Sequence, residues 1–218
     1  MNEMGIVVIL VVIFMGWFAI GMIYNLRRGD AIMKWMQGGL PKVGAKTSFD
    51  WLGSSVLRLV IDRAQRPMRS LTVLLVFMPR DVFWMTLWAL IQGRRDVLIF
   101  RGQASQVPAI DLELAHPKTW TGRTAIQQAR QRNWESRPYG DLLLLAPHGL
   151  LDLAEETVNR LGDSIKKLSP GYVRFALRRQ DPHFELHLPL PDIRATDAAE
   201  YFGALQALVG ALANRQAD

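Results

Sequence analysis

The segment His183–His187 (HFELH) carries the pattern in this sequence that most resembles a metal site. Alternate residues of a β-strand share one face, so the two imidazoles and the carboxylate between them would lie about 7 Å apart. These groups bind zinc and related metals when a fourth ligand is present. The alternative is that apolar positions 184, 186 and 188 face a core and leave a polar outer face. We favour this alternative, expect no metal and no cofactor, and retain one candidate ligand set: His183, Glu185 and His187.

The two remaining histidines offer weaker chemistry. His116 precedes a proline and His148 follows one, where an ordinary surface role is the simplest interpretation. Pairing with Asp111, Glu113 or Asp152 would give acid–base pairs. The sequence contains no nucleophile-elbow, zinc-protease or phosphate-loop signature. We therefore expect a protein that is not an enzyme, and we assign no catalytic residue and no small-molecule substrate.

The composition narrows the class of protein further. The chain has 218 residues and no cysteine, which excludes disulfides, iron–sulfur clusters, cysteine-ligated zinc and thiol nucleophiles. Apolar residues make up 50% and charged residues 21% of the chain, so general disorder is not expected. A chain of this length can build one or two domains with a real core.

The N-terminal segment 5–24 is a candidate membrane span. Its twenty residues carry no charge, and a helix of that length covers roughly 30 Å, the thickness of the hydrocarbon layer. Trp17 and Tyr24 lie toward its C-terminal end, as interfacial aromatics often do. A cleaved signal peptide fits less well, because no basic residue precedes the apolar run and Arg27-Arg28 follows it. We expect an uncleaved anchor.

Basic residues concentrate after this anchor. Nine Lys or Arg residues and three Asp residues lie between positions 25 and 70. Because cytoplasmic flanks carry the Lys and Arg excess, we expect the N-terminus outside and the C-terminal domain in the cytoplasm. A nucleic-acid-binding module would carry its excess on the folded domain, so no nucleic acid is expected. Basic side chains attract anionic lipid headgroups, and the candidates here are Arg27, Arg28, Lys34, Lys42 and Lys46.

Three parts of the chain are expected from these patterns. They are a transmembrane anchor (1–28), a basic juxtamembrane connector (29–54) and a cytoplasmic domain (55–218). The connector contains Gly38-Gly39-Leu40-Pro41, which ends any continuation of the membrane helix. Within the domain, a boundary between two units would lie near 133–140.

Hydrophobic periodicity predicts an α+β domain. Strands are expected at 56–62, 71–78, 97–101, 110–114, 141–146, 173–177 and 184–188. Helices are expected at 82–92, 121–132, 150–168 and 198–213, with Asp81 and Thr121 as N-caps of the first two. The order β-α-β-β-α occurs twice, which indicates either two ferredoxin-like units or one mixed sheet covered by helices.

The helix expected at 82–92 lacks the polar stripe of a surface helix. Trp84 and Trp88 lie one turn apart on it. Three interpretations remain open: a buried core helix, a helix at the membrane interface or on a partner's membrane helices, and a re-entrant hairpin with 71–78. The residues expected to dock on membrane or partner are Val82, Phe83, Trp84, Leu87, Trp88 and Ile91.

The run Leu71–Trp84 (LTVLLVFMPRDVFW), the helix after it and Asp96–Phe100 (DVLIF) resemble the strand, Arg/Asp turn, helix and strand of the calumin family. That family comprises single-pass endoplasmic-reticulum proteins, coiled-coil-containing subunits of the PAT complex. The later helix 150–168, strand pair and closing helix recur in similar order. The family's acidic lumenal segment and basic coiled-coil tail have no counterpart in this sequence. The resemblance implies an accessory role in membrane-protein insertion.

Two functions from different classes are carried forward. The first is a non-enzymatic single-pass accessory protein, a scaffold or an assembly or insertion factor for a membrane protein complex. Its expected partners are integral membrane proteins and the membrane lipid surface. The second is a membrane-tethered enzyme or metal-binding protein that uses the His183/Glu185/His187 strand face. The anchor, the apolar helix 82–92 and the lack of catalytic signatures favour the first.

Overall fold

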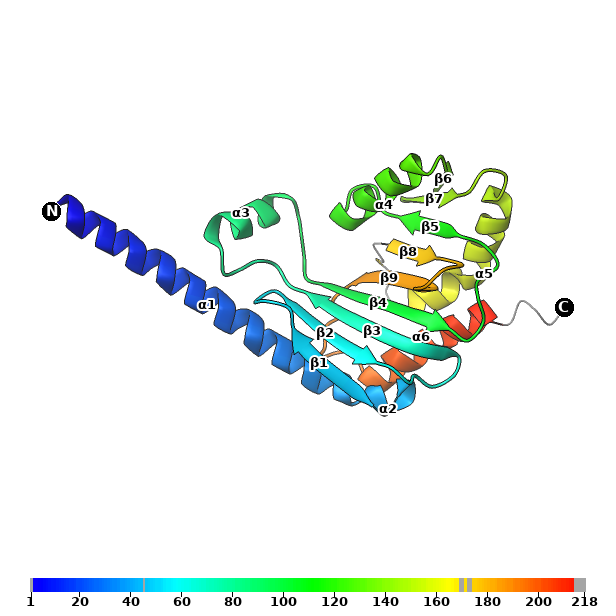
Figure 1. The fold of residues 1–218 in the computed structure, drawn as a ribbon, viewed down its shortest axis with the longest axis horizontal. Helices are drawn as coiled ribbons and strands as arrows, with labels where there is room; N and C mark the ends of the chain where they lie inside the picture. The colour runs from blue at the N-terminus through cyan, green and yellow to red at the C-terminus, as the bar shows by residue number, and fades with distance from the viewer. Residues whose placement is uncertain (1, 45, 169–170, 172–173, 214–218) are drawn as a thin grey trace.

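The computed structural model describes residues 2–44, 46–168, 171 and 174–213. One long N-terminal helix projects from an α+β domain built on a single broad sheet (Figure 1). The helices are α1 (Glu3–Gln37), α2 (Leu40–Val43), α3 (Phe83–Ile91), α4 (Trp120–Gln131), α5 (Leu151–Leu168) and α6 (Ala198–Ala213). The strands are β1 (Thr47–Trp51), β2 (Val56–Ile61), β3 (Met68–Val76), β4 (Val97–Ala104), β5 (Leu112–Ala115), β6 (Glu135–Tyr139), β7 (Leu142–Ala146), β8 (Arg174–Leu177) and β9 (Phe184–Pro189).

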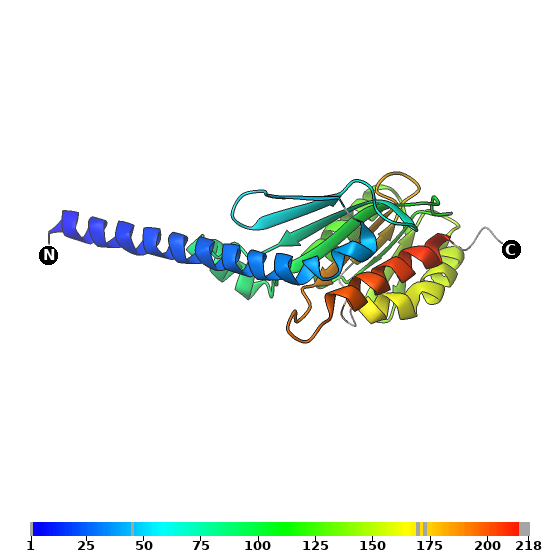
Figure 2. The ribbon, with the colours of Figure 1, turned by 90° about the horizontal axis from the view of Figure 1, so that it is seen from below.

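Helix α1 extends well beyond the apolar segment. Its 35 residues span about 52 Å at 1.5 Å per residue. It is the one helix in the described part of the chain that is long and apolar enough to cross a membrane. The N-terminal part stands clear of the domain, whereas the C-terminal part runs beneath the sheet (Figure 2). Its buried residues recur every three or four positions and so form one face: Gly21, Asn25, Gly29, Ile32 and Met36.

The stretch 29–54, expected to be a connector, is instead part of the fold. Helix α1 continues to Gln37, α2 follows, and β1 forms the edge of the sheet. Ile32 and Met36 belong to the main core cluster. The indole of Trp35 donates a hydrogen bond of 2.7 Å to the carbonyl oxygen of Thr196. The C-terminal part of α1 is thereby packed onto the domain.

All described strand pairs are antiparallel, in the order β1-β2-β3-β4-β9-β8-β5-β7-β6. The C-terminal strands β8 and β9 lie between β4 and β5. Of the two arrangements expected, two βαββα units or one mixed sheet, the structure shows one sheet, and its described strand pairs are antiparallel. The segment 133–140, expected as a boundary, contains β6, which pairs with β7 at the sheet edge.

Helix α3 is an excursion from the sheet and does not cover it. Strands β3 and β4, which flank it in sequence, are hydrogen-bonded neighbours. The helix begins at Phe83 with Val82 at its N-cap. Asp81, expected to be the cap, instead accepts a 2.5 Å hydrogen bond from the Ser54 hydroxyl. Gly93, with φ of +64°, closes the helix as expected, because glycine adopts this conformation without steric cost.

One face of the sheet is apolar and covered by helices. The end of α1 and helices α5 and α6 lie side by side on that face (Figure 2). Alternate strand residues such as Phe100 and Leu186 point into this core and are fully buried. The helical spacing in 150–168 and 198–213 and the strand alternation in 184–188 are confirmed, because burial of apolar area selects these faces.

The opposite face is covered only in part. Helix α4 packs over β5 and β7 through a small second cluster, and Thr119, not Thr121, caps it by accepting a bond from the Gly122 N–H. Beside this cluster, Glu113 forms ion pairs with Arg174 and Arg178. The carboxylate is only 2% exposed. Buried charges are tolerated when they are paired in this way.

We predict that Glu113→Gln destabilises the domain by about 3–5 kcal/mol, because two largely buried guanidinium groups lose their shared carboxylate. The measurement is denaturant unfolding of the full chain in detergent. Asp50→Asn is the matched control, since Asp50 pairs with Arg58 in solvent and its loss should cost about 0–1 kcal/mol. Equal effects of the two substitutions would contradict the assignment of a buried ion network.

Candidate membrane-facing site

Helix α3 presents an exposed apolar surface. Among its residues only Ala89 is buried, while Trp84 and Trp88 are 64% and 61% exposed. The core-helix interpretation of 82–92 is therefore wrong. The hairpin interpretation is also wrong, because 68–76 forms β3, an interior strand of the sheet that pairs with β2 and β4. What remains is a helix held outside the core with its aromatic side chains free of the domain.

Helix α3 lies against the apolar part of α1. The rings of Trp17 and Phe83 meet edge to face with centroids 5.1 Å apart, and Phe14 and Trp84 do so at 6.2 Å. Phe14 precedes Asn25 by eleven positions, which corresponds to about 16 Å along the helix. A bilayer around the apolar segment would thus also surround α3, to a depth of about one leaflet.

The apolar side chains of both helices are exposed and adjoin one another. Contiguous exposed apolar surface of this extent is unusual for a domain surrounded by water and marks an interaction surface. On α3, the exposed apolar side chains of this surface are Phe83, Trp84, Met85, Leu87, Trp88, Leu90 and Ile91. Val82 from the expected docking set is only partly exposed.

A polar junction holds the root of α3 on α1. The buried Asn25 amide donates a 3.1 Å hydrogen bond to the carbonyl oxygen of Met78. Its oxygen accepts a 3.1 Å hydrogen bond from Arg80. The Arg80 guanidinium also lies 5.1 Å from the centre of the Tyr24 ring. Each of these contacts joins the segment that enters α3 to one level of the membrane helix.

Asp96 is the centre of this junction. Its carboxylate is nearly buried and accepts two hydrogen bonds from Arg80, at 2.9 and 3.1 Å, and one of 2.9 Å from the N–H of Met78. Arg28 on α1 pairs with it at 2.8 Å. The carboxylate therefore joins α1 to both segments that flank α3.

Glycine permits the close approach of α1 to this junction. A Cβ at Gly21 would lie 2.1 Å from the carbonyl oxygen of Arg80, and one at Gly29 would lie 2.5 Å from the Trp51 ring. Neither distance is sterically allowed, so a side chain at either position would force the segments apart. By contrast, a Cβ at Gly16 meets nothing within 4 Å.

The expected lipid-contact residues are placed at different levels. Arg27 is exposed immediately after the apolar segment, and Arg28 pairs with Asp96. Lys34 is exposed further along α1, and Lys42 and Lys46 lie beyond its C-terminal end at Gln37. That end is about 18 Å from Asn25 along the helix axis. Lipid contact of these five residues stays a prediction.

Several residues that adjoin the end of the apolar part of α1 were not recognised as candidates from the sequence. Asn25, Arg80 and Asp96 were not singled out, and neither was the pair Arg94-Arg95. A signal was present, because Arg94-Arg95 follows the apolar helix α3 as Arg27-Arg28 follows the apolar segment of α1. The contacts of Asn25 and Asp96 are made with residues distant in sequence and left no local pattern.

The three candidate metal ligands, His183 just before β9 and Glu185 and His187 on it, are not brought together. The Nε2 of His187 lies 2.5 Å from Oε1 of Glu185, whereas the Nδ1 of His183 lies 3.2 Å from the carbonyl oxygen of Ala104. In the described residues, no three His, Asp or Glu side chains are grouped so as to hold a metal ion. The face expected to be polar carries the ion pairs of Glu185 with Arg101 and Arg174.

The environment of this pair fixes its protonation. Burial lowers the pKa of His187, and the hydrogen bond to Glu185 opposes that shift only in part, so the imidazole is neutral at neutral pH. Burial by itself would raise the pKa of Glu185. The hydrogen bond from His187 and the charge of Arg174 outweigh this and lower it to about 2. A neutral imidazole and a permanently ionised carboxylate form a structural pair here, since both are engaged by neighbours.

The other histidines form none of the expected acid–base pairs. His148 pairs with Glu135, and the Nδ1 of His116 accepts a 3.1 Å hydrogen bond from the N–H of Lys118. Asp152 instead forms an ion pair with Arg137. His148 is thus paired with Glu135 and not with one of the expected carboxylates, and its side chain is 88% exposed.

Comparison with known proteins adds no name to this site. No protein-family model matches the chain, and no curated protein is detectably similar to it.

We predict that Gly21→Ala loosens α3 from α1, although Gly→Ala in a helix is ordinarily favourable by about 1 kcal/mol. Because the chain has no cysteine, Phe14→Cys with Trp84→Cys gives a clean cross-linking reporter for thiol reagents of graded length. Adding Gly21→Ala should lengthen the shortest reagent that links the pair, whereas Gly16→Ala should not. Unchanged linking in the Gly21→Ala chain would show that the junction is not tight.

Proposed function

We propose that this chain is a single-pass membrane protein with its N-terminus outside and its α+β domain in the cytoplasm. In this proposal it serves as a non-enzymatic accessory protein, a scaffold or an assembly or insertion factor for a complex of membrane proteins. The observation that carries the proposal is α3, an exposed apolar helix fixed beside the apolar half of α1. A helix of nine residues is too short to cross a bilayer, so it enters one leaflet and presents its surface there.

The arrangement of charge supports the membrane location and the orientation. Arg27 and Arg28 follow the apolar part of α1, and Arg94 and Arg95 follow α3. The Asp96 junction brings both Arg pairs to the same end of the apolar surface. Positive charge at this end marks the cytoplasmic side.

A groove between α1 and α3 is consistent with a protein partner. It has a volume of about 330 Å³ and is lined mainly by apolar side chains of both helices, among them Trp17, Ile20 and Leu90. A groove between two adjacent helices offers a third helix apolar packing on both sides. The partner we propose is therefore a transmembrane helix of another protein.

The resemblance to the calumin family also supports an accessory role in membrane-protein insertion. We also propose that the second half of the domain is a ferredoxin-like unit. Strands β7 and β8 run parallel on either side of β5, and α5 connects them. This is the split β-α-β arrangement of such units.

The competing proposal is a membrane-tethered enzyme or metal-binding protein that uses His183, Glu185 and His187. It has weaker support, because His187 is only 3% exposed and His183 contacts the backbone of Ala104. A substrate or metal would have to displace the ion pairs of Glu185 to reach this face.

The orientation predicts a protease pattern. In inside-out vesicles, added protease should degrade residues after α1 and leave the membrane segment, because the domain then lies outside the vesicle. In right-side-out vesicles the domain should be protected until detergent is added. Protection in the first preparation and digestion in the second would reverse the proposed orientation.

The accessory role predicts contact between α3 and a membrane protein. A photo-reactive amino acid at Trp88 should cross-link, in native membranes, to a defined integral membrane protein, and Trp84→Ser introduced beside it should reduce the yield. The same probe at Phe49, which is also exposed but lies on β1, is the control and should give no such product.

The cross-linking test requires that substitutions on α3 leave the domain folded. Trp84→Ser with Trp88→Ser should leave a cooperative unfolding transition, since substitutions of exposed residues usually change stability by about 0.5 kcal/mol or less. Cross-links from position 88 to lipid alone would make α3 a lipid anchor and contradict the proposed partner.

A further inference from the structure

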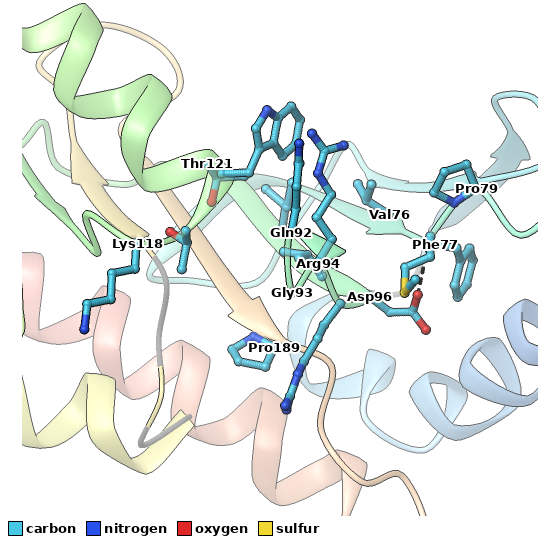
Figure 3. Close-up of a pocket in the computed structure, with 16 residues that line it drawn as sticks. Val76, Phe77, Pro79, Gln92, Gly93, Arg94, Asp96, Lys118, Thr121 and Pro189 are labelled. Atoms are coloured by element: carbon cyan, nitrogen blue, oxygen red, sulfur yellow. Dashed lines mark hydrogen bonds between the residues drawn. The ribbon is translucent and has the colours of Figure 1, made fainter. Parts of the chain in front are cut away.

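A pocket lies where the root of α3 meets the start of α4. Its volume is about 370 Å³. Figure 3 shows Lys118 and Thr121 on one side, Val76, Phe77 and Asp96 on the other, and Gln92–Arg94 between them. The pocket is thus formed by segments that the sheet and the Asp96 junction bring together.

The charged residues of this pocket favour an anion. Arg94, Arg95 and Lys118 all line it. The one carboxylate among its lining residues, Asp96, is already paired with Arg28 and Arg80. The three cations therefore have no opposing charge within the pocket, and phosphate groups are bound by such clusters of Arg and Lys.

Buried polar groups in the pocket lack partners. The Nε of Arg94 and the Oγ1 of Thr121 are inaccessible to solvent and form no hydrogen bond with any described residue. Unsatisfied buried polar groups are costly. Both atoms are covered by protein, so the acceptor oxygens of a ligand would reach them only after the Arg94 and Thr121 side chains shift. The Arg94 guanidinium is also held over the Trp120 ring, 4.9 Å from its centre, which orders it before a ligand arrives.

The remaining wall is apolar. Val76, Val97, Ile99 and Pro189 contribute it. An inorganic ion would leave this surface uncovered, whereas a molecule with a phosphate and an attached hydrocarbon part would cover it. Met78, Pro79 and Gln92 place the pocket directly at the root of α3, which is the level of the headgroups if α3 lies in the leaflet.

We infer that this pocket binds the headgroup of an anionic phospholipid. The phosphate is held by Arg94 and Arg95, Lys118 contributes positive charge at the pocket rim (Figure 3), and the glycerol and first methylenes lie on the apolar wall. The inference rests on the proposed membrane location of α3 and adds the ligand class of a site outside the α1–α3 groove. One bound lipid would then hold the domain against the membrane surface, in addition to α1.

The test is native mass spectrometry of the full chain in neutral detergent, titrated with phosphatidylglycerol or phosphatidylcholine. The expected result is one tightly bound phosphatidylglycerol. Arg94→Gln with Arg95→Gln should weaken its binding by about 30-fold, from the loss of two headgroup-facing charges. The charge-matched control is Lys166→Gln with Lys167→Gln on α5, where both residues are exposed, and it should bind like the unmodified chain.

A second variant separates the effect of pocket shape from the effect of its charge. Val76→Phe fills the pocket without changing the net charge and should also abolish the tight site. Competition by inorganic phosphate at millimolar concentration would show a soluble phosphate ligand and overturn the lipid assignment. Equal binding of both lipids, or equal loss in the α5 control, would likewise overturn it. Cross-linking from Trp88 and the protease pattern are independent of these variants, so failure here is distinguishable from failure of the proposed function.

Discussion

The placement of α1 and α3 relative to the domain depends on the hydrogen bonds and ion pairs of the buried Asp96 carboxylate. It accepts hydrogen bonds from Arg80 and from the backbone of Met78, and it pairs with Arg28 on α1. A buried carboxylate that loses its partners costs about 3–5 kcal/mol. The segments that enter and leave α3 and the helix α1 are therefore most stable when assembled together, and Gly21 allows the backbones to approach closely enough for this.

This junction explains why an apolar helix can remain outside the core. Strands β3 and β4 pair directly, so the chain between them leaves the sheet at the end of β3 and returns at the adjacent start of β4. Arg80 and Asp96 occupy the base of the excursion and satisfy one another there. Phe83 and Trp84 consequently contact Trp17 and Phe14 of α1, and Trp88 remains exposed. In a bilayer this surface would be solvated by lipid or by another membrane segment.

The two faces of the sheet use different physical means to exclude water. One face buries apolar side chains beneath α1, α5 and α6. The other combines a small apolar cluster under α4 with the ion pairs of Glu113, Arg174 and Glu185. Because β8 and β9 lie between β4 and β5, the C-terminal part of the chain completes both faces, and the domain cannot be divided into independent halves.

The sequence by itself determined the apolar helix, the strongly periodic helices 150–168 and 198–213, and the buried strands, because burial imposes a period that can be read locally. It did not indicate β1 or β6, which are edge strands with polar residues and, in β6, a proline at position 138, a residue that edges tolerate. It named the aromatic face of α3 but left open whether that face was buried. Only the tertiary structure decided this, and only it placed Asn25, Arg80 and Asp96 together or separated His183 from His187. These outcomes depend on strand order and on contacts between distant segments, and such contacts leave no periodic trace along the chain.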